Sequence, residues 1–229
     1  MFFFSTNNDE IMVDSFGELI IDKYEIVYMF ENDKAKINPI IDSMILNSQQ
    51  TIELIKTCEF SFKSEFKLLY RATRDGFSSK VFPSKCDKIS KTLTIIKVKD
   101  APHIFGGYAE VTWGGNGYKQ DKIAFLFSLV NDYNKPLKLK NINQFSQHLE
   151  DKEIYSHSNC GPTFGGGHDF FISSDSNINE DSFSNLGHTY KYPILSDESY
   201  DPKSILAGSN HFSTSEIEVY EIINNIIQK

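Results

Sequence analysis

The stretch from Thr92 to Val130 reads TLTIIKVKDAPHIFGGYAEVTWGGNGYKQDKIAFLFSLV, and it decides the fold class. It contains three runs rich in β-branched and aromatic residues, Thr92–Val98, Ile104–Trp113 and Ile123–Val130. Such residues pack well on a pleated sheet surface, and turns rich in Gly, Asn and Asp separate the runs. Short strands joined by short links indicate antiparallel pairing, which is typical of a β-sandwich.

The sequence on either side continues this pattern. Further strands are predicted at Phe66–Ala72, Leu137–Leu139, Glu153–His157, His168–Ile172 and Phe212–Ile223. Short helices are predicted at Ser48–Thr57, with Ser48 as the cap, and at Ser78–Cys86, with a bend at Pro83. We therefore expect a fold that is mainly β with some α, an antiparallel two-sheet β-sandwich flanked by short helices.

A polar linker from Asn32 to Pro39 marks a domain boundary. We assign residues 1–40 to an N-terminal extension and residues 41–229 to the main domain. The extension holds two apolar runs, Ile11–Val13 and Leu19–Phe30, which are typical of a hairpin or of a strand followed by a helix.

Cysteine usage and apolar runs restrict the compartment. The three cysteines, Cys58, Cys86 and Cys160, are odd in number and far apart, and no C-x-x-C pair exists. An oxidising compartment favours an even, denser set, so we expect reduced thiols in the cytoplasm or also in the nucleus. The start of the chain lacks the pattern of a signal peptide, and no apolar run is long enough to span a membrane.

Charge is distributed unevenly along the chain. The net charge is −8, yet residues 56–99 carry eleven Lys and Arg against four Asp and Glu. This excess suggests a surface for a polyanion, formed by the four lysines closest together around the second predicted helix: Lys80, Lys85, Lys88 and Lys91. The alternative is that these charges scatter around a sandwich and never converge.

Signatures of catalysis and of metal binding are weak. No G-x-S-x-G, H-E-x-x-H or P-loop motif occurs, so we expect no catalytic residue, no cofactor and no small-molecule substrate. His157, Cys160 and His168 lack a fourth zinc ligand, so no metal site is predicted. Cys86 lies near three lysines that would lower its pKa and make it a redox thiol, and the alternative is an inert, half-buried cysteine.

Two glutamates and two arginines are candidates for partner binding. In the C-terminal strand, Ile217 and Val219 share one face, whereas Glu216 and Glu218 share the other. We expect these glutamates to face outward or to line a cleft, so that replacing Glu218 would cost little stability.

The only two arginines of the chain, Arg71 and Arg74, lie three residues apart. A guanidinium group presents a planar fork of donors. We expect at least one of the two to form a bidentate pair with a carboxylate, and Asp75, Glu110 and Glu218 are the candidates.

Several segments, taken in order, resemble one family. FKLLYRATRDGFS from Phe66 and FPSKCD from Phe82 resemble signatures of the TLDc domain family, of which the oxidation-resistance-type proteins are members. TLTIIK, IFGGYAEVTW, FGGGHDFFI, AGSNHF and EIEV are similar to the family's later blocks. The resemblance covers about Ile41 to Ile222.

The resemblance implies an antiparallel β-sandwich and a non-enzymatic role in the oxidative-stress response. It also implies action through protein partners, in several members the vacuolar proton-pumping ATPase. The alternative is a DNA-binding transcriptional regulator of the stress response that uses the lysine-rich segment 56–99.

Overall fold

The computed structural model describes residues 3–6, 9–12, 41–61, 64–141, 152–192 and 201–223. By its internal contacts the chain divides into two compact units, Met1–Pro39 and Ile40–Lys229. In the smaller unit, β1 (Phe3–Thr6) and β2 (Asp9–Met12) form an antiparallel hairpin. The apolar run from Leu19 to Phe30 lies outside the described residues.

The larger unit contains two six-stranded sheets, which we call the central and the outer sheet. The central sheet has the strand order β3-β14-β4-β5-β7-β8. Its strands are β3 (Glu65–Arg71), β14 (Thr214–Ile223), β4 (Thr92–Val98), β5 (Ile104–Ala109), β7 (Phe125–Val130) and β8 (Leu137–Lys140). All neighbours pair antiparallel.

The outer sheet has the order β13-β12-β11-β10-β9-β6. Its short strands are β13 (His211–Phe212), β12 (Ser182–Ser184), β11 (Phe170–Phe171), β10 (Thr163–Phe164), β9 (Ile154–Ser156) and β6 (Gly117–Lys119). The short helices are α2 (Ser48–Cys58), α3 (Ala72–Asp75), α4 (Val81–Cys86) and α5 (Ser204–Ala207). The predicted antiparallel two-sheet fold with short helices is confirmed.

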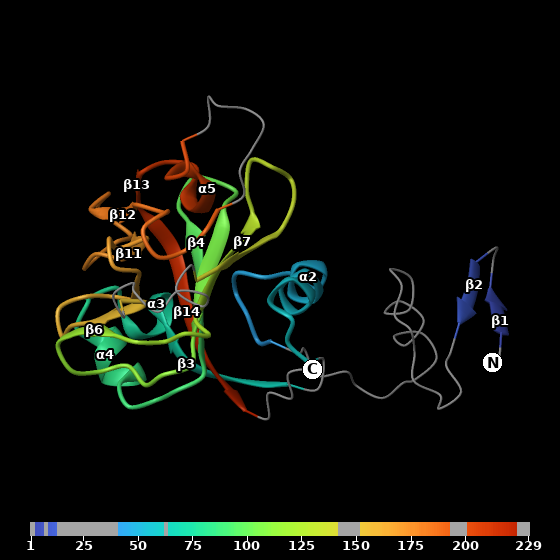
Figure 1. The fold of residues 1–229 in the computed structure, drawn as a ribbon, viewed down its shortest axis with the longest axis horizontal. Helices are drawn as coiled ribbons and strands as arrows, with labels where there is room; N and C mark the ends of the chain where they lie inside the picture. The colour runs from blue at the N-terminus through green and yellow to red at the C-terminus, as the bar shows by residue number, and fades with distance from the viewer. Residues whose placement is uncertain are drawn as a thin grey trace. The chain divides into compact units, whose positions relative to one another are not determined.

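The central sheet is covered on both faces (Figure 1). Toward the outer sheet it buries side chains such as Ile96 and Phe105 against Phe170 and its neighbours. Toward α2 it buries side chains such as Ile95 and Phe127 against Leu54 of the helix. Double burial explains why six of the seven residues of β4 are buried, since both faces of the strand are covered.

The last predicted strand is two strands in the structure. Phe212 pairs with Ser182 in the outer sheet, whereas β14 begins at Thr214 and pairs with β3 and β4 in the central sheet. The chain therefore changes sheets at Ser213. The two strands follow each other without a turn residue between them, and the register of β14 shifts between Thr214 and Glu216, which the sequence pattern does not show.

The cap of helix α2 lies one residue earlier than predicted. Its cap is Asn47, whose side chain accepts a hydrogen bond from the Gln50 backbone N–H at 2.9 Å, while the Gln50 side chain accepts from the Asn47 N–H at 3.0 Å. Ser48 is the first helical residue and not the cap. Asn and Ser are comparable caps, and here the reciprocal pair with Gln50 favours Asn47.

The glycines of β5 let the central sheet pack closely. A Cβ atom on Gly106 would lie 1.9 Å from the Thr94 carbonyl oxygen of the neighbouring strand. A Cβ atom on Gly107 would lie 2.9 Å from the ring of Phe164, which comes from the outer sheet. No side chain fits at either position without moving its neighbours, so these glycines serve backbone packing.

Candidate functional site

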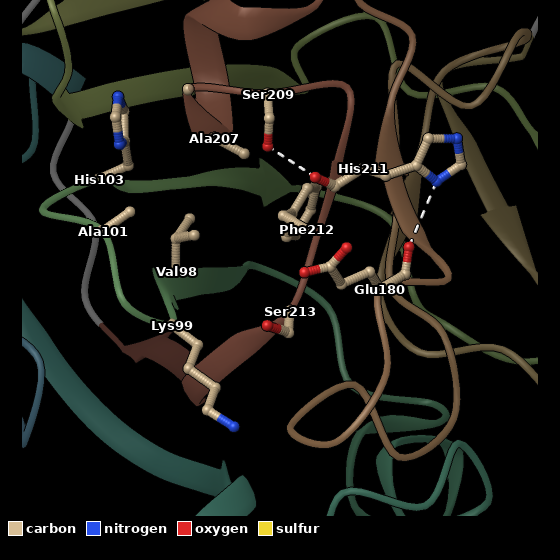
Figure 2. A pocket seen from close by; sticks show the side chains of 11 residues that line it. Val98, Lys99, Ala101, His103, Glu180, Ala207, Ser209, His211, Phe212 and Ser213 are labelled. Atoms are coloured by element: carbon tan, nitrogen blue, oxygen red, sulfur yellow. Dashed lines mark hydrogen bonds between the residues drawn. The ribbon is translucent and has the colours of Figure 1, made fainter.

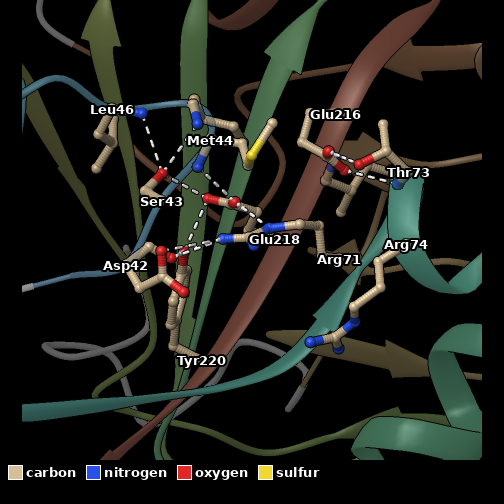
Figure 3. A network of polar contacts seen from close by, with 12 residues as sticks. Asp42, Ser43, Met44, Leu46, Arg71, Thr73, Arg74, Glu216, Glu218 and Tyr220 are labelled. Carbon is tan, nitrogen blue, oxygen red and sulfur yellow. Dashed lines mark hydrogen bonds and ion pairs between the residues drawn. The ribbon is translucent and has the colours of Figure 1, made fainter.

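Arg71 and Glu218 stand at the centre of a polar network on the α2 side of the central sheet (Figure 3). They face each other across β3 and β14, where their Cα atoms are paired in register. The Arg71 Nε donates to Glu218 Oε1 at 2.7 Å. The Glu218 side chain is fully buried and the Arg71 side chain is 12 % exposed, so this is a buried ion pair.

The segment 42–46 lies across this ion pair, and we call it the strap. The Ser43 hydroxyl donates to Glu218 Oε2 at 2.5 Å, and the Met44 backbone N–H donates to Glu218 Oε1 at 2.8 Å. The Arg71 Nη2 donates to the Asp42 carbonyl at 2.7 Å. The strap therefore joins the beginning of the larger unit to its last strand through one carboxylate.

Tyr220 completes the network from the same face of β14. Its hydroxyl lies 2.8 Å from both the Asp42 carbonyl and Glu218 Oε2. Burial, and then the adjacent Glu218 carboxylate, raise the pKa of Tyr220 above its ordinary value, so the hydroxyl stays protonated and can donate. With Tyr220, the Glu218 carboxylate has four donors around it, which offsets the cost of burying its charge.

Glu216 performs a second structural task on the same strand. Its carboxylate accepts from the Thr73 backbone N–H at 3.0 Å, from the Thr73 hydroxyl and from the Ile217 N–H. Thr73 lies in the first turn of α3, whose N-cap residue, Arg71, makes no side-chain capping bond. Glu216 thus supplies from β14 an acceptor that the helix lacks locally.

The expected outward orientation of Glu216 and Glu218 is wrong. The alternation itself holds, because Ile217 and Val219 belong to the core between the sheets. The opposite face of β14 is also covered, so Glu216 is 6 % exposed and Glu218 is fully buried. A single strand pattern cannot reveal that α3 and the strap cover its polar face, and Glu218 is consequently a core residue.

The predicted bidentate pair is confirmed at Arg74. Its Nε donates to Asp75 Oδ1 at 3.1 Å and its Nη2 donates to Oδ2 at 2.7 Å. Asp75 also accepts from the Arg71 backbone N–H at 3.0 Å, and Lys85 lies 3.5 Å from it. The hydrogen bond from Arg74 is the main reason that the pKa of Asp75 is lowered to about 2.

Cys86 does not have the environment of a redox thiol. It is fully buried in the core between the sheets, although Lys85 and Lys88 beside it are exposed. Burial raises the pKa of Cys86 well above its ordinary value and outweighs the effect of Lys85. Of the two interpretations of Cys86, the inert cysteine fits these surroundings and the thiolate does not, because nearness in sequence to lysines says nothing about the direction of the sulfur.

The four lysines of the predicted polyanion surface are exposed, and carboxylates lie beside two of them, Lys85 and Lys88. Lys85 faces Asp75, and Lys88 lies close enough to Asp87 to lower the pKa of that carboxyl, which burial raises overall. Lys91 lies beside Glu110, whose carbonyl accepts from the Lys91 backbone N–H at 3.1 Å. For Lys80 the structure records exposure alone.

Sequence reasoning missed Asp169, within the FGGGHD motif. Its buried carboxylate accepts four backbone N–H bonds, from Gly187, His188, Thr189 and Tyr190, at 2.8 to 3.3 Å. A Cβ atom on Gly165 would lie 1.9 Å from this carboxylate, which explains the glycine. Ser43 and Thr73 were also missed, and no local signal marks either of them as a partner of a glutamate.

The arrangement holds segments of the larger unit together. The side chains of this site form hydrogen bonds and ion pairs within the larger unit: Arg71 with Glu218, Arg74 with Asp75, and Glu216 with Thr73. Within the described ranges no cluster of three or more His, Cys, Asp or Glu could hold a metal ion. No helix in the same part of the chain is long and apolar enough to cross a membrane.

A family model described as TLDc domain matches residues 40–223. No protein of curated function matches the sequence.

Proposed function

The chain belongs to the TLDc domain family, whose role is an oxidative-stress-related one in protein binding, and we propose that its partner is the vacuolar proton-pumping ATPase. We propose further that it acts by occupying a surface of that complex and not by catalysing a reaction. The family is generally non-enzymatic.

One observation carries this proposal, namely that the family match, residues 40–223, covers nearly all of the larger unit, Ile40–Lys229. The larger unit is therefore matched by the TLDc domain over nearly its full length. The buried network of Arg71 and Glu218 also supports the proposal, because these ionisable residues stabilise the fold by bonding to each other and to the strap. Partner binding then belongs to the outer surface of the domain.

A direct binding experiment tests the proposal. The full chain is immobilised through a tag and exposed to purified soluble and membrane sectors of the vacuolar ATPase. We expect saturable binding of one sector, competed by untagged chain. An unrelated protein with a net charge near −8 controls for attraction by charge alone. Absence of binding, or equal retention on the control protein, would contradict the proposal.

A second measurement separates binding from catalysis. Cys58 and Cys86 are buried, and burial raises the pKa of each thiol, while Cys160 is partly exposed and its pKa is also raised. We therefore expect no peroxide consumption by the purified chain, because the thiolate is the reactive form. A saturable peroxidase rate that disappears in a Cys160→Ser variant would contradict the proposed binding role and indicate a thiol enzyme.

A further inference from the structure

A continuous row of rings crosses the outer sheet, one strand after another, and we call it the aromatic row. Its members are Tyr118, Tyr155, His168, Phe171, Phe183 and His211, with successive ring centroids 4.9, 5.0, 5.8, 5.3 and 6.1 Å apart. The strand β10 contributes the small residue Thr163 opposite Phe171. The ring of His168, a residue with a positive φ of 54°, lies between Tyr155 and Phe171.

The aromatic row lies on the solvent face of the outer sheet. On each strand the neighbouring residue points the other way, so that Ile154, Phe170 and Phe212 are buried in the core. The four central rings of the row are partly exposed, and the rings at its two ends, Tyr118 at 38 % and His211, are exposed. Rigid rings held in contact with one another lose little entropy when a partner covers them, which is typical of binding surfaces.

A pocket of about 200 Å³ opens at the His211 end of the aromatic row (Figure 2). Its walls combine apolar side chains, including Val98, Ala207 and Phe212, with the carboxylate of Glu180. Sites for drug-sized ligands have about 300 to 1,000 Å³. This pocket is smaller, so its volume suits one long side chain.

Two polar groups of the pocket have no partner among the described residues. The Glu180 side chain is exposed and takes part in no ion pair or hydrogen bond with the described residues. His211 Nδ1 contacts the backbone carbonyl of Glu180, at 3.3 Å, and not its carboxylate. His103 is buried, and its Nδ1 has no hydrogen-bond partner in the described chain, while its Nε2 lies 3.2 Å from the Asp132 carboxylate. Lys99, the cation of the pocket wall, donates instead to the Asn177 carbonyl at 3.0 Å.

These features select a cationic side chain. An arginine or lysine places its apolar stem against Val98 and Phe212 and its charged head toward Glu180, as long basic side chains do at apolar surfaces. The faces of aromatic rings also attract cations, and the row already holds one, since Lys152 Nζ lies 5.3 Å from the Tyr118 ring centroid. The net charge of −8 attracts a basic segment from a distance.

We propose that the Glu180 pocket receives an arginine or lysine side chain of a partner protein, and that the adjoining residues of that partner lie along the aromatic row. The proposal deepens the protein-binding function proposed above by naming a surface and the chemistry of the partner. Single-stranded nucleic acid also stacks on aromatic rings, but it needs a positively charged groove. Glu180 and the exposed Asp181 at this end of the row repel phosphate.

The test uses two fluorescent peptides that share their tryptophans and differ in carrying either arginines or glutamates. The fluorescence anisotropy of each peptide is measured while the full chain is added at neutral pH, and it should show tighter binding of the arginine peptide. Glu180→Gln should weaken that binding by roughly tenfold or more, as expected when a hydrogen bond to a charged group is lost. Asp181→Asn removes the same charge one residue away, outside the pocket, and should change binding by less than about twofold.

A Tyr118→Ala variant tests the far end of the row and should weaken the arginine peptide several-fold without altering the melting curve. Equal losses in Glu180→Gln and Asp181→Asn would overturn the proposal, because long-range attraction would then explain the binding. Equal affinity for the glutamate peptide would overturn it as well, as would tighter binding of oligothymidylate. If the chain binds the arginine peptide but does not retain the proton pump, the pump is not its partner, and the proposal for this surface still holds.

Discussion

Two polar regions of the larger unit are built in opposite ways. Around Glu218 the charges are buried, and the carboxylate accepts hydrogen bonds from the strap, from Arg71 on β3 and from Tyr220 on β14. At the end of the aromatic row, Glu180 is exposed and has no ion-pair or hydrogen-bond partner for its carboxylate within the described residues. A buried charge must be paired to be tolerated, whereas an exposed unpaired charge costs little and stays available. The first region therefore belongs to stability and the second to recognition.

The largest effect should come from breaking the buried pair. Glu218→Ala leaves Arg71 without its carboxylate, and breaking a buried pair in this way costs about 3 to 5 kcal/mol of unfolding free energy. The matched control is Glu221→Ala on the same strand, whose partner Lys67 also lies on β3, at 3.1 Å, but is 62 % exposed. That exposed pair contributes roughly 0 to 1 kcal/mol. Urea unfolding of both variants measures the difference.

Equal midpoints for the two variants would contradict the division into a stabilising and a recognising region. The outcome would mean that water reaches Glu218 as readily as Glu221.

The strap should be the next most sensitive element. Ser43→Ala removes the hydroxyl that donates to Glu218 and that accepts from the Ile45 and Leu46 N–H groups at 3.0 Å. We expect a loss of about 1 to 3 kcal/mol, the cost of leaving buried polar groups unsatisfied. Ser84→Ala, at an exposed hydroxyl in α4, is the control and should cost under about 0.5 kcal/mol. Thermal unfolding with circular dichroism detects both changes.

Faster proteolytic cleavage within residues 41–46 of Ser43→Ala should accompany the loss of stability. Cleavage at the wild-type rate would show that the strap is held by packing and not by the carboxylate.

A smaller effect should appear at acid pH through Asp75. Its pKa is lowered from the ordinary 3.8 to about 2, chiefly by the hydrogen bond from Arg74. A lowered pKa in the folded state stabilises the protein above the unfolded pKa, and this contribution is lost as the pH falls through the folded pKa. We therefore expect the stability advantage of the wild type over Asp75→Asn to shrink between about pH 4 and pH 2. A pH-independent difference would mean that Asp75 contributes through shape alone.

The sequence predicts the fold of the larger unit well and its polar network only in part. Runs such as Thr92–Val98 fix strands because their side-chain chemistry is local, and Arg74 with Asp75 are adjacent, so their fork could be predicted. The burial of Glu218 depends on Ser43 and Met44, which are about 175 positions away in the chain. A pattern of period two shows that two faces differ, but it does not show that a helix covers the polar one.

Cys86 and the aromatic row both show that neighbours in the sequence do not determine the surroundings of a side chain. Lysines beside Cys86 in sequence suggested a reactive thiol, but the sulfur points into the core while the ammonium groups point into water. The six rings of the row come from five strands and one loop between positions 118 and 211. Only strand register brings them into one line, and register depends on pairing between distant segments.

The smallest effect should come from the lysine surface, where the alternative function as a DNA-binding regulator can be examined. Replacing Lys85, Lys88 and Lys91 by Glu should change the unfolding free energy only slightly, because exposed substitutions stay within about 0.5 kcal/mol each. With four lysine–phosphate contacts, the binding constant for DNA would fall with at most about the fourth power of the salt concentration. Carboxylates such as Asp75 and Asp87 stand among these lysines and oppose phosphate. We therefore expect DNA binding that is weak and lost at moderate salt in an electrophoretic shift. A sequence-specific shift that survives physiological salt, and that the triple replacement abolishes, would make the chain a gene regulator and leave the aromatic row without its proposed role.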